Sequence, residues 1–556
     1  MKTAKILLIV SFILIVFGSA GLYAADDIRK APPYYTELPE SPYGFIPPAV
    51  DMSHLGRKSP GGVFKPAALP AAFDWRDSGY VTAIRNQSTC GACYSFASLA
   101  NFEARVQLDG GTAFDFSENN AKECNYSGAS CAGGNNQILA NLFSQKGTVL
   151  ESCDAYVASD VTCNSACAYI KTLLDWQIIS GSVIPSATDL KTYIINNGPV
   201  YTSLYAGNSD AWDTEFGAYN GSYTLYYAGA EATNHAVCIV GWDDALTHAG
   251  GTGGWIVKNS WGTSWGDNGY FKIAYGSANI GQYSSFVSGW QDYDTNGEIM
   301  YYDEAGMNSY WGSGSSTTAW GLCEFVPSDD IDISRVEFWT NDITTDVDVY
   351  IYDDFNGTTL SNLLASKLNQ SYSEAGYHSV QLDAPLEVSS GSDIYVAVKV
   401  TNDSYMYPVA ADGTGPNETA TTYISITGSS WTDLGVSYGE DVGIRVRGTY
   451  SLGLSVDDDE DDLPYDFNLE QNFPNPFNPN TSIAFTLPER ADVNLTVYNL
   501  LGQKVRTLVD EFRQAGEHTV QWNGHDEADR PLATGVYYYQ ITAGDRSATR
   551  KMVLLK

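Results

Sequence analysis

Basic residues are scarce in this chain. Lys and Arg number 30 against 66 Asp and Glu, so the formal net charge of the 556 residues is −36 at pH 7. Because nucleic-acid binding needs a positive surface that neutralises phosphates, this balance argues against nucleic acid as a partner. Charged residues of both signs make up only 17% of the sequence, whereas aromatic residues reach 13%. That combination is typical of extracellular β-rich modules rather than of helical cytosolic enzymes.

Long apolar stretches are also lacking. The N-terminal run from Ile6 to Phe17 has 12 residues, and no other stretch approaches the length of about 18 that a membrane-spanning helix needs. Two lysines precede this run and Leu22-Tyr23-Ala24 ends it, which predicts a secretory signal peptide over residues 1–24, with an uncleaved anchor as the alternative. We therefore expect a mature chain without an integral membrane span, in a compartment where disulfides form.

Cysteine is absent from most of the chain. All nine cysteines lie between Cys90 and Cys323, and seven of them lie between Cys90 and Cys167. No cysteine follows the predicted cleavage site directly, so a lipoprotein is not indicated. Covalent cross-links, and any chemistry that uses a thiol, are therefore expected in one domain.

Composition divides the rest of the chain into five segments. Residues 25–68 are rich in proline and read as an irregular leader or pro-segment. Residues 69–290 show a mixed α+β pattern, and residues 291–452 alternate apolar and polar positions as in a two-sheet β-sandwich. Residues 453–465 form an acidic linker, which lacks the glycine and the spaced glutamate of a calcium-binding EF-hand loop. Residues 466–556 form a further all-β module.

The sequence Cys90-Gly91-Ala92-Cys93 has three alternative interpretations: half of a zinc site, a redox pair, or one bridged cysteine beside one reactive cysteine. Apolar residues recur at near-helical spacing after Cys93, which predicts a helix that begins there. A helix N-terminus favours the thiolate of a cysteine placed at it. The third interpretation then needs a histidine that another side chain holds in place.

Two histidines follow Cys93 in the α+β region. His248 lies in a glycine-rich stretch that we expect to be a loop, whereas His235 opens the apolar strand NHAVCIVGW and would be fixed by a sheet. Asn259, in the stretch WIVKNSWG, can orient the imidazole through its side-chain carbonyl, and Trp261 can shield that hydrogen bond from water. A zinc site or a redox pair would leave Asn259 and Trp261 unexplained, so we favour a reactive Cys93.

The stretches NQSTCGACYSFA, SCAGG, NHAVCIVGWD and KNSWGTSWGDNGYFKI occur in this order, and together they resemble the papain/cathepsin family of cysteine peptidases. His235 follows Cys93 by 142 residues and Asn259 follows it by 166, close to the spacing in that family. The resemblance covers about 220 of the 556 residues. It implies an α+β papain-like two-lobe domain, with a helical lobe and a β-barrel-like lobe, that hydrolyses peptide bonds without a metal or organic cofactor.

The resemblance also implies a role for each motif residue. Cys93 would be the nucleophile that forms a thioester acyl-enzyme, His235 its acid and base, and Asn259 the residue that orients the imidazole. Gln87 would donate its side-chain amide to the oxyanion, together with the backbone N–H of Cys93. The residues implied to contact a protein or peptide substrate are Gly133, Gly134, Trp261 and Trp265.

By the same resemblance, two disulfides leave Cys93 free, namely Cys90–Cys131 and Cys124–Cys163. A third bridge between Cys153 and Cys167 stays an open question, because the family is no guide there. Cys238 lies inside an apolar strand and is expected to be a buried free thiol.

The chain departs from the family pattern in three places. Tyr94 stands where Trp is commoner, and Ser88 stands where Gly is commoner beside the oxyanion glutamine. The leader, residues 25–68, is too short for the usual inhibitory propeptide and lacks its helical pattern. One hypothesis is that this leader stays attached and packs on the enzyme.

The two segments that follow carry softer resemblances. The stretch AGYHSVQLDAPLEVSSGSDIYVAVKV resembles the lectin-like β-sandwich behind some bacterial papain-like peptidases. Its Tyr310, Trp311 and Trp431 are expected to be exposed and able to stack on a sugar, with burial in the core as the alternative. The stretches NFPNPFNPNTSIAFTLPE, VYNLLGQKVRTLV and GVYYYQI resemble the C-terminal sorting domain of the type IX secretion pathway, a small Ig-like module, with a passive spacer as the alternative.

These features predict a secreted or outer-membrane surface-attached bacterial cysteine endopeptidase. Its expected partners are protein or peptide substrates, a carbohydrate or cell-surface ligand of the sandwich, and the type IX secretion machinery. The rival hypothesis is a non-catalytic adhesin that uses the peptidase fold as a scaffold, but such a scaffold would have no need of the intact set Cys93, His235, Asn259 and Gln87. A transferase or ligase that passes the acyl group to an amine would keep the same four residues.

Overall fold

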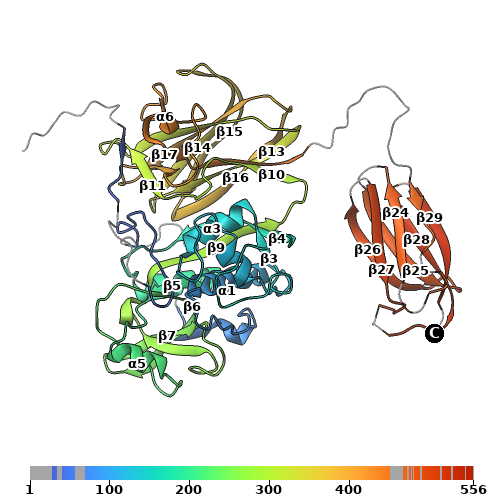
Figure 1. Cartoon of the computed structure of the whole chain (residues 1–556), viewed down its shortest axis with the longest axis horizontal. Helices are drawn as coiled ribbons and strands as arrows, with labels where there is room; N and C mark the ends of the chain where they lie inside the picture. The colour runs from blue at the N-terminus through green and yellow to red at the C-terminus, as the bar shows by residue number, and fades with distance from the viewer. Residues whose placement is uncertain are drawn as a thin grey trace, which may run out of the picture. The chain divides into compact units, whose positions relative to one another are not determined.

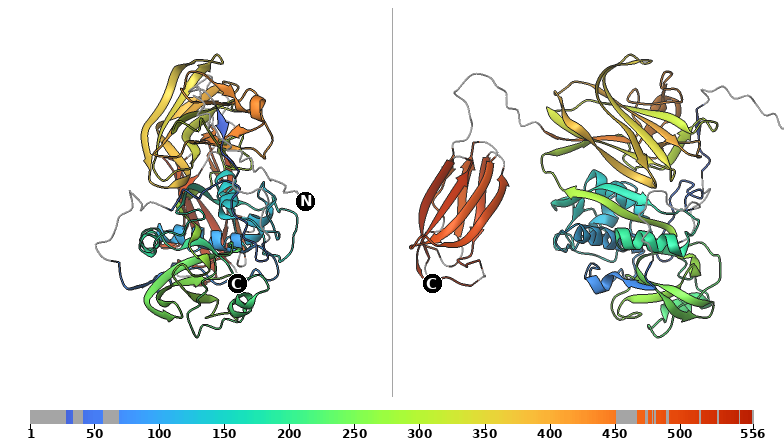
Figure 2. Two further views of the ribbon diagram at one scale, coloured as in Figure 1. Left: turned by 90° about the vertical axis from the view of Figure 1, so that its left-hand side faces the viewer. Right: turned by 180° about the vertical axis from the view of Figure 1, so that it is seen from behind.

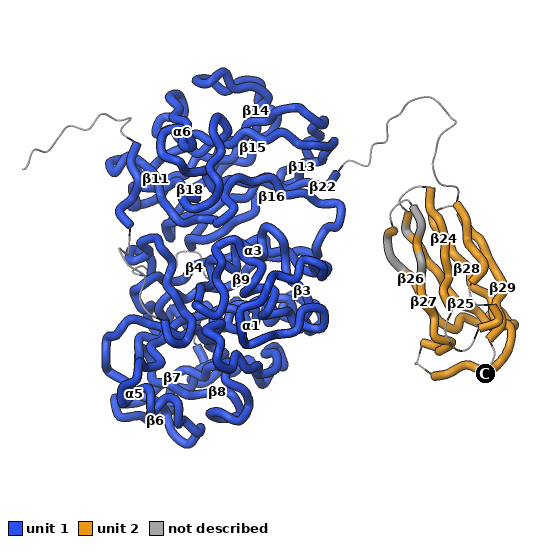
Figure 3. The backbone as a smooth tube through the Cα atoms, in the orientation of Figure 1, with its two compact units in different colours: residues 1–453 blue, residues 454–556 orange. Residues whose placement is uncertain are grey.

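A computed structural model describes residues 28–33, 41–56 and 69–450, and in the tail residues 467–472, 475–477, 479, 481–488, 491–513, 516–527, 530–544 and 546–554. The expected signal peptide (1–24) and acidic linker (453–465) lie outside these residues. The chain divides into two units, residues 1–453 and 454–556 (Figure 3). No helix in the described part of the chain is long and apolar enough to cross a membrane.

Three helices form one lobe of the α+β region: α1 (Cys93–Leu108), α2 (Glu118–Glu123) and α3 (Asn136–Gln145). Helix α1 is buried on nearly all sides, as expected of a helix at the centre of a domain. The side chain of Ser117 caps α2 by accepting from the Asn120 backbone N–H, and Asn135 caps α3 by accepting from Ile138. The remaining helical segments are η1 (Trp75–Ser78), α4 (Ala187–Asn197), α5 (Ala211–Gly217) and η2 (Ser277–Asn279).

The strands of this region are β2 (Ala72–Asp74), β3 (Thr148–Val149), β4 (Tyr169–Ile178), β5 (Val200–Leu204), β6 (His235–His248), β7 (Gly251–Lys258), β8 (Tyr270–Ala274) and β9 (Gln282–Asp292). Six of them pair in the order β4-β9-β5-β6-β7-β8, and α1 packs against β6 (Figure 1). Strands β6 and β7 form a hairpin. His248 therefore ends a strand at the hairpin tip and does not lie in the loop that the sequence suggested.

The β-rich region is a two-sheet sandwich, which confirms the predicted fold class. Its elements are β10 (Gly297–Met300), β11 (Ser309–Gly312), β12 (Thr318–Phe325), β13 (Ile331–Thr340), β14 (Thr345–Phe355), β15 (Leu360–Tyr372), β16 (Ala375–Val388), β17 (Ile394–Asn402), β18 (Val409–Asp412), β19 (Thr422–Ser425), β20 (Thr432–Asp433), α6 (Leu434–Tyr438), β21 (Asp441–Val442) and β22 (Ile444–Tyr450). One sheet has the order β15-β14-β17-β12-β19-β20, and the other contains β10-β22-β13-β16. In β14 the alternate residues Val347, Val349 and Ile351 are buried between the sheets.

A smaller sheet, β1-β11-β18-β21, adds the leader strand β1 (Arg29–Lys30) to the sandwich. Strand β11 lies between β1 and β18, and its Tyr310 and Trp311 pack into two different hydrophobic clusters, so each is only 2% exposed. The expectation that these two aromatic residues are exposed is therefore wrong, and the alternative of a place in the core is correct for them. Trp431, by contrast, is partly exposed.

The sandwich and the α+β region share one hydrogen-bonded sheet. Strand β16 of the sandwich pairs with β4, with Ala375 opposite Ile178 and Tyr377 opposite Trp176. The path β10-β22-β13-β16-β4-β9-β5-β6-β7-β8 therefore runs from one region into the other without a break. Figures 1 and 2 show the yellow sandwich directly against the cyan and green elements. The sequence pattern changes near residue 290 because the architecture changes there. The backbone hydrogen bonding of the sheet nevertheless continues across this boundary.

A buried ion pair also joins the two regions. Arg445 on β22 and Asp303 are both fully buried, with 2.7 Å between Nη2 and Oδ2. The same guanidinium donates to Ser144 Oγ at 2.9 Å and to Asn141 Oδ1, and both of these residues belong to α3. Because an unpaired buried charge is costly, this network fixes β22 against α3.

The second unit is an all-β Ig-like module, as predicted. Its strands are β23 (Asn468–Leu469), β24 (Thr481–Leu487), β25 (Ala491–Asn499), β26 (Lys504–Arg513), β27 (Gly516–Trp522), β28 (Gly535–Ala543) and β29 (Arg546–Leu554). They form two sheets, β23-β24-β27 and β26-β25-β28-β29. Leu495, Val497 and Tyr539 are fully buried between them, so the unit has a hydrophobic core of its own.

Candidate active site

Cys93 is the first residue of α1, and its thiol is fully buried. The backbone N–H of Ala236 donates to Cys93 Sγ at 3.2 Å. Ala236 follows His235 at the start of β6, and α1 packs on this strand. Packing of the helix on the sheet therefore brings two residues together that lie 142 positions apart in the sequence.

Three disulfides lie in the helical lobe, namely Cys90–Cys131, Cys124–Cys163 and Cys153–Cys167. Because Cys90 is bonded to Cys131, it forms no redox pair with Cys93 and offers no free thiolate to a shared zinc ion. Cys93, Cys238 and Cys323 are free and buried. A reduced thiol is thus present at the N-terminus of α1.

His235 is held by Asn259. The imidazole Nε2 lies 2.8 Å from Asn259 Oδ1, and that oxygen also accepts from the Ser260 backbone N–H at 2.9 Å. Because the amide oxygen only accepts, Nε2 carries the proton and Nδ1 of the neutral ring keeps its lone pair. Nδ1 is buried and has no hydrogen-bond partner among the described residues. It is therefore the nitrogen that can take a proton from a neighbouring group.

Two tryptophans cover this pair in succession. The rings of Trp261 and His235 lie 5.1 Å apart, centroid to centroid, so Trp261 shields the imidazole from one side. Trp265 packs on Trp261 at 4.9 Å and donates its indole N–H to the Gly217 carbonyl at 3.1 Å. Trp265 thus supports Trp261, one layer further from the histidine.

Gln87 already binds a peptide carbonyl. Its Nε2 donates to the backbone oxygens of Cys90 at 2.9 Å and Tyr43 at 3.2 Å, and its Oε1 accepts from Ser260 Oγ at 2.7 Å. The Ser260 contact fixes which end of the amide points toward the cleft, by which we mean the space beside Cys93 and His235 that leader residues 41–46 cover. Tyr43 belongs to the leader, so the amide predicted to hold an oxyanion is occupied by the chain's own N-terminal segment.

The leader covers His235 directly. The ring of Tyr43 lies 5.7 Å from the imidazole and 5.5 Å from the ring of Trp261. Phe45 donates its backbone N–H to the carbonyl of Asn234, the residue before His235, at 3.2 Å. The leader thus packs on the papain-like region, as hypothesised, and it does so across the candidate active site.

Gly133 and Gly134 contact the backbone of the same segment. Gly134 donates its N–H to the Gly44 carbonyl at 2.9 Å and accepts from the Ile46 N–H at 2.9 Å, so the leader runs parallel to it. A Cβ atom on Gly44 would lie 1.9 Å from the Gly91 oxygen, and one on Gly133 would lie 2.8 Å from the Gly44 oxygen. Both Gly44 (φ 106°) and Gly133 (φ 115°) also have the positive φ that favours glycine.

Burial controls the charges of the pair. It raises the pKa of Cys93 to about 12, although hydrogen bonds from backbone N–H groups lower it. It lowers the pKa of His235 to about 4, although the hydrogen bond to Asn259 raises it. With the leader in place, thiol and imidazole are therefore both uncharged at neutral pH. The helix N-terminus alone, which the sequence suggested as the source of a thiolate, does not outweigh this loss of water.

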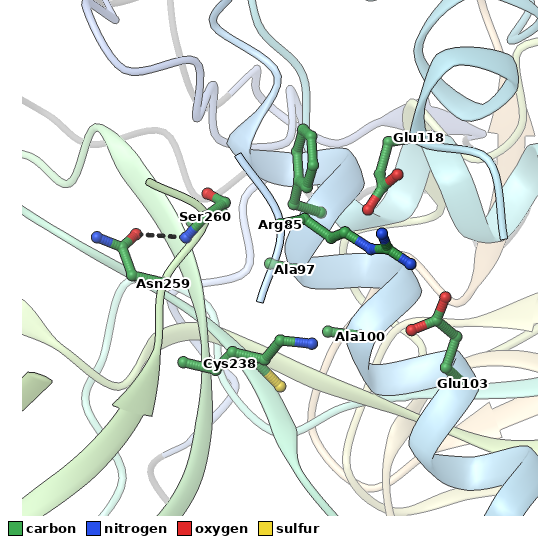
Figure 4. A pocket seen from close by; sticks show the side chains of 11 residues that line it. Arg85, Ala97, Ala100, Glu103, Glu118, Cys238, Asn259 and Ser260 are labelled. Carbon is green, nitrogen blue, oxygen red and sulfur yellow. Dashed lines mark hydrogen bonds between the residues drawn. The ribbon is translucent and has the colours of Figure 1, made fainter. Parts of the chain in front are cut away.

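A cavity of about 20 Å³, room for about one water molecule, lies behind Asn259 (Figure 4). Its ionisable lining residues are Arg85, Glu103, Glu118, Cys238 and Lys258. Lys258 Nζ donates to Thr82 Oγ1 at 2.9 Å, and Thr82 donates to Glu103 at 2.6 Å. Burial raises the pKa of Glu103 and lowers that of Lys258. Because Lys258 precedes Asn259 in the chain, this network fixes the backbone that carries the amide.

Comparison with known proteins agrees with this geometry. Residues 69–289 match the papain family cysteine protease model, residues 299–446 match the lectin like domain, and residues 476–547 match the FlgD Ig-like domain. Cysteine proteinase 3 of Entamoeba histolytica is 33% identical over 228 residues, which cover 40% of this chain and 69% of that protein. The chain belongs to the papain family of cysteine proteases.

Other papain-family relatives are longer than the matched region. The senescence-specific cysteine protease SAG12 of Arabidopsis thaliana is 32% identical over 209 residues, which cover 37% of this chain and 57% of the relative. The chain thus spans little more than half the length of that plant protein. The sandwich and the Ig-like tail of the present chain lie outside its papain-family region, residues 69–289.

A solved structure shares both the papain-family domain and the sandwich. The crystal structure of the cysteine protease and lectin-like domains of Cwp84, a surface layer associated protein of Clostridium difficile, has a TM-score of 0.61 at 18% identity. The match covers 77% of this chain and 99% of that chain. At this identity the likeness concerns the fold, which joins a papain-like domain to a lectin-like sandwich.

Two contacts of this papain-family site were not foreseen from the sequence. Ser260 lies inside the quoted KNSWG stretch, but its bond to Gln87 becomes visible only once the strands are placed. Tyr43 lies in a proline-rich leader whose one hint is the short stretch YGF, a glycine between two aromatic residues. The structure brings the four motif residues Cys93, His235, Asn259 and Gln87 together beneath this stretch.

Proposed function

We propose that this papain-family chain is a secreted cysteine endopeptidase that hydrolyses peptide bonds through a thioester on Cys93. The observation that carries the proposal is the leader carbonyl held by Gln87, with Tyr43 O accepting from Nε2 at 3.2 Å. A peptide oxygen bound by this amide is what acyl transfer requires, because the tetrahedral intermediate develops its negative charge there. Protein and peptide substrates would displace the leader and take its place.

The first half of the reaction forms the acyl-enzyme. His235 takes the proton of Cys93, and the thiolate adds to the carbonyl carbon of the substrate. The carbonyl oxygen becomes an oxyanion that the Gln87 amide and the Cys93 backbone N–H stabilise. The C–N bond then breaks, and His235 gives its proton to the leaving amine, which departs and leaves a thioester.

The second half returns the enzyme to its starting state. Water loses a proton to His235 and attacks the thioester carbonyl, which releases a carboxylic acid and restores the Cys93 thiol. Asn259 accepts from Nε2–H throughout, so Nδ1 is the nitrogen that takes up and returns the proton, and Trp261 keeps water away from their hydrogen bond. Gly133 and Gly134 would bind the substrate backbone that replaces the leader.

Labelling with an epoxide inactivator of thiol proteases, followed by peptide mass mapping, tests this proposal. We expect one label per molecule of activated protein, on Cys93, with loss of activity in proportion. A Cys93→Ala protein that still turns over peptides would overturn the assignment. Wild-type protein that stays inactive and unlabelled after removal of residues 25–56 would favour the adhesin, and products with a newly acylated amine would favour a transferase.

We also propose that the protein is exported to the surface of a bacterium and that residues 466–556 act as a type IX sorting domain. The predicted signal peptide, the motifs of the tail and its Ig-like fold support this, and Cwp84 is itself a surface layer associated protein. Deletion of residues 466–556 should trap the protein before the outer membrane. Unchanged export would instead support a passive spacer.

For the sandwich we propose a carbohydrate or cell-surface ligand near Trp431. This residue is partly exposed and packs at 6.0 Å on Phe355 within an aromatic cluster on the outer face of the six-stranded sheet. Aromatic rings on a partly exposed face can stack on sugars. Glycan binding that Trp431→Ala abolishes would support the proposal, whereas absence of glycan binding would favour a structural role.

A further inference from the structure

The described leader lies on both halves of the first unit. Its first strand, β1, pairs with β11 of the sandwich, whereas residues 41–46 lie across the cleft. Further along, His54 contacts the sandwich, while Met52 lies against Gly181 of the papain-like region. Among residues 28–33 and 41–56 there is no helix. The leader therefore has no folded body of its own there, and its position depends on what it touches.

The first anchor is a strand addition with a buried carboxylate behind it. Lys30 pairs with Trp311 in the β1–β11 register, and the Ala31 N–H donates to the Tyr310 carbonyl at 2.8 Å. Lys30 Nζ lies 2.5 Å from Oε1 of Glu440, whose side chain is 7% exposed. The other oxygen, Oε2, accepts from the Trp311 indole N–H at 2.7 Å. The leader thus supplies a cation to a buried carboxylate of the sandwich.

The second anchor is an aromatic stack between the leader and the sandwich. The ring of His54 lies on the ring of Tyr405 at 4.1 Å and 3°, and His54 Nε2 donates to the Asn341 carbonyl at 2.6 Å. Met52 and Leu55 beside it are buried. Tyr405 and Asn341 both belong to the sandwich, so the leader is held there on both sides of the segment that blocks the cleft.

We propose that the lectin-like sandwich is the receptor for the leader and that, by holding Lys30 and His54, it keeps residues 41–46 in the catalytic cleft. This inference rests on the proposed function, because holding the leader in the cleft regulates catalysis only if the cleft is catalytic. The sandwich takes the place of the helical body that this short leader lacks. Loss of either anchor lets residues 41–46 leave the cleft more often, because the same chain carries both.

Hydrogen exchange of the full secreted chain, read by mass spectrometry, tests this inference. We would use a Cys93→Ala background, in which no self-cleavage occurs, and add Lys30→Ala, Glu440→Gln or His54→Ala. Exchange of the amides of residues 41–46 should accelerate about tenfold or more in each variant, because local opening becomes easier. Glu440→Gln removes the ion pair without leaving a buried charge, so it separates loss of the anchor from damage to the sandwich.

Lys367→Ala is the matched control. Lys367 pairs with Asp383 on the surface of the same sandwich, and neither residue takes part in the leader contacts described above. We expect it to leave residues 41–46 unchanged, and we expect the amides of α1 to stay protected in every variant. Unchanged exchange of residues 41–46 in the anchor variants, or equal acceleration in Lys367→Ala, would overturn the inference. Failure of the peptidase proposal would appear separately, as a Cys93 that the epoxide does not label in protein freed of residues 25–56.

Discussion

Burial sets the charge of His235, and the Tyr43 ring of the leader is one of the groups that cover the imidazole. Its pKa of about 4 comes from loss of water around the ring, because the hydrogen bond to Asn259 acts in the opposite direction. Once residues 41–46 leave, water returns and the pKa rises toward its ordinary value of about 6.5. The same change lowers the pKa of the Cys93 thiol from about 12. We therefore expect Cys93 and His235 to form a thiolate–imidazolium pair more readily in the open state.

Acid should therefore weaken the hold of the leader. Between about pH 6.5 and pH 4, the open state binds a proton on His235 that the leader-bound state does not, so the leader-bound state loses stability as the pH falls through this window. Above pH 6.5 this residue contributes no further change. The loss at pH 4 is at most about 3 kcal/mol. Hydrogen exchange of residues 41–46, corrected for the intrinsic pH effect, measures it.

A His235→Gln variant provides the control for this pH dependence. It cannot take up the proton, so the corrected exchange of residues 41–46 should lose most of its dependence between pH 6.5 and pH 4. If the variant and the wild type respond alike, another titrating group controls the leader. Residues of the buried cavity, such as Glu103, would then be the next to vary.

Gly44→Ala should unseat the leader. The new Cβ would lie 1.9 Å from the Gly91 oxygen, and the positive φ of 106° adds strain. Overpacking of this kind typically costs about 1–3 kcal/mol, so labelling of Cys93 in the leader-bearing chain should become about tenfold faster or more. Gly110→Ala is the matched variant, because Gly110 also has a positive φ but nothing within 4 Å. Equal rates of labelling in the Gly44→Ala variant and the wild type would contradict the close contact between Gly44 and Gly91.

Asn259→Ala should reduce turnover while leaving the fold intact. The imidazole would lose the 2.8 Å bond that fixes its tautomer and orientation. Misplacement of a catalytic group costs on the order of 10²-fold, and the loss should fall on kcat, with KM nearly unchanged. Steady-state kinetics on a peptide substrate measures both. A rise of KM alone would mean that Asn259 contacts the substrate instead.

At the scale of elements, the sequence predicted the helices and strands whose formation depends on the spacing of neighbouring apolar residues. Apolar spacing after Cys93 indicated the helix, and the run after His235 indicated the strand. The pairing of β16 with β4 left no such pattern, because backbone hydrogen bonds between residues about 200 positions apart carry no side-chain signature. The buried partners of Arg445 were invisible for the same reason. Sequence therefore predicted the sandwich as a module and missed its union with the peptidase.

Arg445→Met should destabilise the first unit strongly. It would leave Asp303 buried without its cation and remove the bonds to α3. Breaking a buried pair in this way costs about 3–5 kcal/mol. Lys399→Met, at a partly exposed pair with Asp348, should cost about 1 kcal/mol or less. Chemical denaturation gives both values, and equal effects would mean that the Arg445 network adds no stability.

At the scale of the whole molecule, the family motifs predicted the order of fold classes along the chain. They could not predict where the leader lies, since its contacts reach residues as distant as Gln87, Tyr405 and Glu440 and depend on shapes that form only in the folded state. The substitution of a sandwich for a helical propeptide body was beyond sequence reasoning for the same reason. The sequence showed only that the leader is too short to be the usual helical propeptide.

Deletion of residues 454–556 should leave the stability of the rest unchanged. The tail has its own core, in which Leu495, Val497 and Tyr539 are fully buried. We expect the melting temperature of the first unit to shift by less than about 2 °C in scanning calorimetry of the shortened chain. A fall of more than about 5 °C would mean that the two units stabilise one another.

The shared sheet also has a consequence for how such proteins are inherited. Recombination that replaced the sandwich by an unrelated module would leave β4 paired with β9 but open its other edge from Trp176 to Ile178, and open strand edges invite aggregation. It would also strip Ser144 and Asn141 of the guanidinium that they hold. We therefore expect gene transfer and recombination to keep the papain-like region and its sandwich together as one unit. The tail, with a core of its own, can be exchanged as a cassette.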